Sequence, residues 1–101
     1  MDFNSIFNDM YNAMTAEFKD NAPKIKDQLK YILENNKAMI EKITNKLVSG
    51  KITPEQYKKL LKRNMRKIED QMSTVNVMKK KAIQDAINAG IDVMMKAIKI
   101  I

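Results

Sequence analysis

Six basic residues within positions 58 to 67 have the chemistry and spacing of a phosphate-binding surface. Closely spaced Lys and Arg neutralise phosphates and release condensed counterions, which is a main source of affinity for nucleic acid. At 100° per residue they fall opposite the apolar residues Tyr57, Leu61 and Ile68. The pattern predicts a basic helix face that is either simply solvated or contacts nucleic acid or an acidic protein. The six residues are Lys58, Lys59, Lys62, Arg63, Arg66 and Lys67.

The excess positive charge of the chain is concentrated around this segment. Residues 58–81 carry nine Lys and Arg against two acids, whereas residues 1–20 have a net charge of −3. A lysine triplet, Lys79, Lys80 and Lys81, ends the basic stretch and is a further candidate contact for an anionic partner. No aromatic residue interleaves with these bases, so stacking on nucleobases has no support within 58–81.

Catalytic and metal-binding chemistry has almost no support in the sequence. His and Cys are absent, and no Gly-rich phosphate loop is present. The adjacent acids Glu69 and Asp70 project in different directions from a helix, so they do not form an acid–base pair. We therefore expect a non-enzymatic protein without catalytic residues, metal, cofactor or small-molecule substrate.

The terminal segments carry the strongest apolar pattern and are the predicted partner interface. Residues 3–18 repeat large apolar side chains at helical spacing, and residues 82–101 are apolar around most of a helix, with a row of small residues that permits close helix approach. Such a helix is either packed against other helices or, as a second alternative, attached to a membrane surface through 79–101. The predicted interface comprises Phe3, Phe7, Met10, Met14, Phe18, Ala82, Ile83, Ala86, Ile87, Gly90, Ile91, Met94 and Ile98.

These surfaces must be positioned by helices. Periodicity predicts helices over about 2–19, 22–48 and 54–101 in one all-α domain that spans 1–101. Low helix propensity near 73–77 and at Gly90 marks two points where a break is possible, so it stays open whether 54–101 is one helix or two. A tight turn is expected at 49–53, because Gly50 suits a helix end while Thr53, Pro54 and Gln56 suit the next helix start.

Two arrangements satisfy this pattern. In the first, a long antiparallel hairpin of about 70 Å places the first helix beside the last segment. In the second, the first helix folds back as part of a three-helix arrangement, and part of 82–101 is left without cover. Both leave apolar surface at the ends of the hairpin, which favours a homo-oligomer or a larger protein assembly.

The turn "LVSGKITPEQYKKLL" at 47–61 resembles the short helical-hairpin motif of SHOCT-type domains, which reads approximately L-x-x-G-x-I-T-x-E-E-F/Y. The matching residues are Leu47, Gly50, Ile52, Thr53, Glu55 and Tyr57, while Gln56 replaces the second Glu. The resemblance covers about fifteen residues, and similar turns occur in small bacteriophage proteins. It implies a hairpin that often accompanies oligomerisation, and it implies no active site.

The expected function is that of a structural subunit that assembles through its apolar terminal helices, in a phage or a secretion apparatus. The alternative is a nucleic-acid-binding accessory protein that uses the face at 58–67. Neither a signal peptide nor a membrane-spanning segment is expected, which would place the protein in the cytoplasm or within such an assembly.

Overall fold

The computed structural model describes residues 2–18, 22–75 and 78–98, and this part of the chain folds into four helices without a strand. They are α1 (Phe3–Thr15), α2 (Ala22–Val48), α3 (Pro54–Met72) and α4 (Lys80–Ile98). The predicted all-α class is confirmed. Residues 19, 76, 77 and 99–101 of the predicted helices lie outside the described ranges.

The turn between α2 and α3 forms as its residue types predict. Gly50 has a φ of 78°. The amide of Lys51 donates to the Lys46 carbonyl at 2.8 Å, and the Gly50 amide donates to the Leu47 carbonyl at 3.1 Å. These bonds close the last turn of α2 in a Schellman motif. Thr53 and Gln56 then form the reciprocal capping box that begins α3.

A second chain reversal separates α3 from α4. Helix α3 ends at Met72 and α4 begins at Lys80, so 54–101 forms two helices that are separated at the weak helical stretch near 73–77. The helix does not break at the second weak point, because α4 continues through Gly90. The residues at 73–75 lower helix propensity and lie outside any helix, whereas Gly90 lies within a packed helix whose contacts offset its cost of about 1 kcal/mol.

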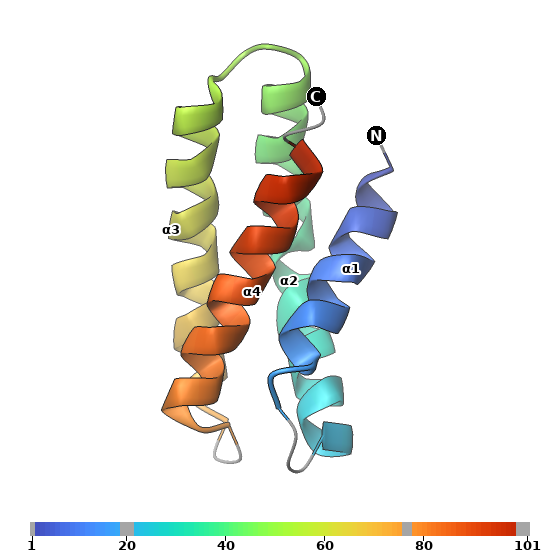
Figure 1. Cartoon of the computed structure of the whole chain (residues 1–101), viewed down its shortest axis with the longest axis vertical. Coiled ribbons are helices and arrows are strands. Elements are labelled where there is room, and N and C mark those ends of the chain that lie inside the picture. The colour runs from blue at the N-terminus through green and yellow to red at the C-terminus, as the bar shows by residue number, and fades with distance from the viewer. Residues whose placement is uncertain (1, 19–21, 76–77, 99–101) are drawn as a thin grey trace.

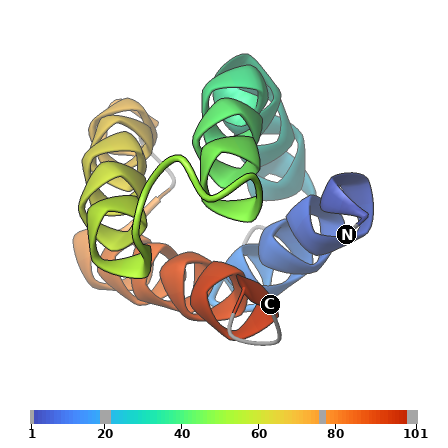
Figure 2. The same cartoon turned by 90° about the horizontal axis from the view of Figure 1, so that it is seen from above.

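The helices run alternately up and down and form a four-helix bundle (Figure 1). Helix α1 packs beside α2 and α4, and α3 packs beside the same two helices (Figure 2). The bundle measures 40 × 21 × 20 Å. It contains the predicted α2–α3 hairpin, but the extended 70 Å form is not observed, because the reversal after α3 returns α4 along the other helices. A fourth helix likewise replaces the expected three-helix arrangement.

Apolar residues from all four helices form one core that is rich in methionine. Gly90 permits the close packing of α4 there, because a Cβ atom at this position would lie 2.9 Å from Met14 Sδ and 3.0 Å from Met65 Cε. Methionine is flexible enough to fill such irregular space. The buried methionines are Met10, Met14, Met65, Met72, Met78 and Met94.

Polar contacts fix how α2 packs on α3. The Thr44 hydroxyl donates to the Ile40 carbonyl at 2.7 Å, and the Tyr57 hydroxyl lies 2.9 Å from the same Thr44 oxygen. Since the Thr44 proton is already used, Tyr57 is the donor in this buried pair. Nearer the other end of the hairpin, Asn36 donates to the Gln71 side chain at 3.1 Å. These two bonds hold the hairpin in a single register.

Candidate functional site

The predicted apolar interface lies inside the bundle. Its residues at 3–18 are buried, those of α1 between α2 and α4, and its α4 residues are buried or, at Ala82 and Ile91, partly buried. The reversal after α3 explains this result, because it brings α4 into contact with both α1 and α3. The apolar surface that was expected to need a second copy is therefore covered by helices of the same chain.

The six bases at 58–67, which we call the α3 basic surface, are all exposed. They occupy the solvent side of α3 because Tyr57, Leu61, Met65 and Ile68 turn inward with no measurable exposure. The acids of α3, Glu55, Glu69 and Asp70, lie outside this segment. All six side chains therefore lie on the solvent-exposed side of α3, and their contact with an anionic partner stays a prediction.

No side chain of the α3 basic surface forms an ion pair with a carboxylate in the described part of the chain. In the ranges that the structure describes, the one ion pair joins Lys96 Nζ to Asp92 Oδ2 at 3.6 Å on α4. The six bases therefore remain free to pair with an external anion. Binding there would not first have to break an internal salt bridge.

The lysine triplet at 79–81 is exposed at the start of α4, at the opposite end of α3 from the turn. Positive charge at a helix N-terminus is unfavourable, because the helix dipole is positive there. The remainder of α4 turns its apolar side into the core, with Ile83, Ile87 and Met94 buried. An apolar face for insertion into a membrane surface is thus not exposed on α4. Within the described residues, no helix combines the length and hydropathy needed to cross a membrane.

Sequence reasoning missed a stripe of exposed residues along α2. Positions separated by three and four residues lie on one side of a helix, and this side of α2 is solvent-facing from Tyr31 to Asn45, with Lys46 half-buried. Tyr31 is 68% exposed and Met39 is 46% exposed. We call this set the α2 outer stripe. It consists of Tyr31, Asn35, Ala38, Met39, Lys42, Asn45 and Lys46.

The α2 outer stripe faces away from α1, because α1 contacts a different side of α2. The Tyr11 hydroxyl donates to the Lys26 carbonyl at 3.1 Å, and Lys37 Nζ lies 5.5 Å from the centre of the Phe7 ring. The side of α2 next to the stripe faces α3. Asn36, which directly follows the stripe residue Asn35, donates a hydrogen bond from its side chain to Gln71 of α3. The stripe therefore runs along the outer side of the α2–α3 hairpin, next to the α3 basic surface.

The far end of the stripe borders a shallow, open hollow with a basic lining. Its wall includes Lys42, Lys46 and Lys51, together with the Ser49 side chain and one acid, Glu41. The hollow lies at the C-terminal end of α2, so positive charge continues from α3 across the turn onto α2.

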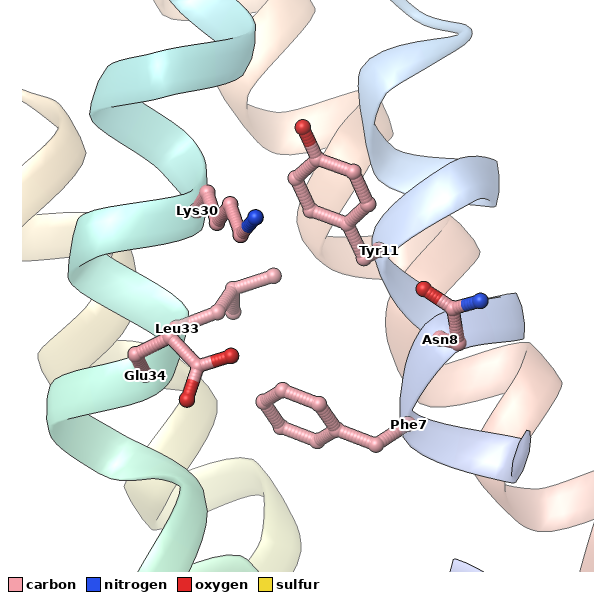
Figure 3. Close-up of a pocket in the computed structure, with 6 residues that line it drawn as sticks. All are labelled: Phe7, Asn8, Tyr11, Lys30, Leu33 and Glu34. Carbon is pink, nitrogen blue, oxygen red and sulfur yellow. The ribbon is translucent and has the colours of Figure 1, made fainter. Parts of the chain in front are cut away.

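A small pocket between α1 and α2 does not suit a small-molecule ligand. Side chains of the two helices face each other there (Figure 3), and the cavity volume is about 130 Å³. Ligand pockets usually measure about 300 to 1,000 Å³. The lining residues are Phe7, Asn8, Tyr11, Lys30, Leu33 and Glu34.

A hollow on the α1–α4 side is acidic. It is lined by Glu17, Asp85 and Asp92, with Asn88 and Ala89 between them. Among the described residues, no group of three metal-ligating side chains is close enough to hold an ion. The bundle thus presents a local patch of negative charge in this hollow, and positive charge on α3, at the C-terminal end of α2 and at the start of α4.

Two tyrosines have altered acidity. Burial raises the pKa of Tyr57, and the hydrogen bond to Thr44 partly offsets that increase. Burial also raises the pKa of Tyr11, with a smaller contribution from the nearby Asp27 carboxylate. A phenol is protonated at neutral pH even at its ordinary pKa of about 10, so both tyrosines can donate hydrogen bonds there, and the raised pKa extends this to more alkaline pH.

Comparisons with family models, curated proteins and solved structures found no significant match to this chain. The resemblance of 47–61 to a SHOCT-type turn therefore stays a prediction.

Proposed function

We propose that this chain is a non-enzymatic binding module whose α3 basic surface holds the phosphate backbone of nucleic acid. One observation supports this most directly: six exposed bases, with no acid among them, lie within ten residues of one helix. The segment rises about 14 Å along the helix axis. This length corresponds to about four base pairs of duplex, so several phosphates lie within reach at once.

The packing of α3 also supports the proposal. Its inner side is anchored by completely buried residues, and its first turn is held by the capping box at Thr53. The helix that carries the bases is therefore ordered before any ligand binds. Preorganisation reduces the entropy lost on binding, so more of the electrostatic attraction appears as affinity.

The test is a salt titration of binding to a labelled random oligonucleotide, followed by fluorescence anisotropy. We expect micromolar affinity at low salt and a steep linear loss of log affinity with log salt concentration. The variant Lys59→Gln/Arg63→Gln/Arg66→Gln removes three charges from the α3 basic surface. It should weaken binding about 10-fold or more and reduce the salt slope by about 2 to 3.

A matched control removes three charges elsewhere. Lys26→Gln/Lys30→Gln/Lys96→Gln changes the net charge equally, at exposed positions outside the α3 basic surface. It should retain most of the affinity and the original salt slope. If both triple variants weaken binding equally, general charge attraction explains the binding, and the proposed surface is rejected.

A second candidate function is assembly of copies of this chain, favoured by the acidic hollow on the α1–α4 side. The carboxylates of Glu17 and Asp85, with Asp92 that also pairs with Lys96, complement the α3 basic surface of another copy. Contact between two different patches is heterologous and builds rings or open filaments. Such a subunit of a phage or secretion apparatus would associate through charge, with its apolar terminal helices remaining in the core.

A further inference from the structure

The aromatic residues of this chain differ in how deeply they are buried. Phe3, Phe7, Phe18 and Tyr57 are buried in the core, and Tyr11 is half-buried against α2. Tyr31 is 68% exposed. A large exposed ring gains little from the hydrophobic core, but its flat face is free to contact a ligand.

Residues along the α2 outer stripe are suited to contact a nucleic-acid strand. Asn35, four residues after Tyr31, offers an amide donor and acceptor, whereas the exposed Met39 and Asn45 lie about 12 Å and about 21 Å from Tyr31 along the helix.

Two exposed acids flank Tyr31 at helical spacing, Asp27 four residues before it and Glu34 three residues after it, on the side toward Tyr11. The stripe residues themselves present an aromatic face, amides and positive charge, so the phosphates of a bound strand would have to lie toward Lys42 and the α3 basic surface, away from these two carboxylates.

In the α2–α3 hairpin, the α2 outer stripe and the α3 basic surface are close enough to contact one nucleic-acid strand. Lys42 lies eleven residues after Tyr31 on the same side of α2, a rise of about 16 Å. Packed helices are separated by about 8 to 10 Å, so the α3 basic surface lies one helix width away. A flexible strand that runs along the hairpin can reach Tyr31, Lys42 and the bases of α3 together.

Resting on the proposed function, we propose that the outer side of the α2–α3 hairpin binds single-stranded nucleic acid, with the Tyr31 ring stacked on an unpaired base. The α3 basic surface and Lys42 hold the phosphates. A single strand fits better than a duplex because the face of a base is available for stacking only when it is unpaired. The Tyr31 ring has no equivalent partner on the outside of a double helix.

The test compares a single-stranded oligonucleotide with a duplex hairpin of equal phosphate number. Tyr31→Ala should weaken single-strand binding about 5-fold or more, because aromatic stacking is lost, and should leave duplex binding and the salt slope unchanged. Tyr31→Phe keeps the ring and should retain the affinity. Val48→Ala, at another exposed apolar position of α2, serves as the control and should behave like the unmodified chain.

An optical measurement reports stacking directly. The chain contains three Tyr and no Trp, so tyrosine dominates its intrinsic fluorescence. We expect quenching when the single strand is added, and expect Tyr31→Phe to lose most of it while still binding. Quenching that persists in Tyr31→Phe would overturn the stacking assignment.

The outcomes separate this inference from the proposed function. If the α3 triple variant loses binding while Tyr31→Ala binds as before, the basic surface is supported and stacking is rejected. If Tyr31→Ala weakens single-strand and duplex binding equally, the preference for single strands is rejected. If neither nucleic acid binds and Tyr31→Ala instead disrupts a complex with a protein, both the proposed function and this inference fail.

Discussion

In the buried hydrogen bond between Tyr57 and Thr44, mutation can show which residue is the donor. Tyr57 donates to Thr44, and Thr44 donates onward to the Ile40 carbonyl. Tyr57→Phe removes the donor but leaves the Thr44 hydroxyl with a partner, so we expect a loss of about 1 kcal/mol in the free energy of unfolding. Thr44→Val leaves a buried phenol without an acceptor and should cost about 2 kcal/mol.

Urea denaturation with a constant m-value measures both losses, and the double variant completes a cycle. Thr44→Val/Tyr57→Phe should cost less than the sum of the single changes, since it leaves neither group unpaired. Equal losses for the two single variants would contradict the assigned direction of the bond.

The sequence predicts the exposure or burial of some residues of the candidate site better than that of others. Exposure of Lys59 and Arg63 follows from helical periodicity alone, because it depends on only one helix. Burial of Phe7 and Met94 was also implied by periodicity, but the sequence did not identify the helix that covers them. Tyr31 lies outside the apolar face of 22–48, and periodicity alone does not distinguish a single exposed aromatic residue from the other solvent-facing residues of a helix.

At the scale of elements, the start of α4 is a weak point that a single substitution can strengthen. The Lys79 carbonyl accepts the first helical bond, from the Ile83 amide at 2.9 Å, which makes Lys79 the N-cap residue. Lysine cannot cap free amides, and its charge opposes the helix dipole. Lys79→Asp should raise the free energy of unfolding by about 1 kcal/mol.

Thermal unfolding measures this gain as an increase in the midpoint temperature of several degrees. Lys79→Ala removes the charge without supplying a cap, so its effect should be clearly smaller. If the Ala and Asp variants were equally stable, charge alone would explain the gain and capping would have no role.

The boundaries of the elements were predictable where the signal was local. Gly50, Thr53 and Pro54 specify the α2–α3 turn through their own backbone and side-chain preferences. The segment at 73–75 signalled only weak helix propensity, which does not say whether the chain bends or reverses. At Gly90, the second point of low helix propensity, the helix does not break, since close packing against Met14 outweighs the low propensity of glycine.

For the whole molecule, the second candidate function makes a distinct prediction about mass in solution. Assembly through the acidic hollow and the α3 basic surface should appear at low salt and disappear at about 0.5 M salt, because exposed charges are screened. Glu17→Lys/Asp85→Lys should prevent this assembly, as measured by sedimentation velocity. Association that persists at high salt would contradict a charged interface and indicate contact through terminal helices that have left the core.

The methionine-rich core also affects the chemical behaviour of the bundle. Thioethers that peroxide reaches become polar sulfoxides, which fit poorly among apolar side chains. Met39 is exposed, whereas Met10, Met14 and Met65 have no measurable exposure. Peroxide should therefore oxidise Met39 at the rate of an accessible thioether, whereas it can oxidise the buried methionines only after the helices separate. Their relative oxidation rates in one sample would thus report how often the bundle opens.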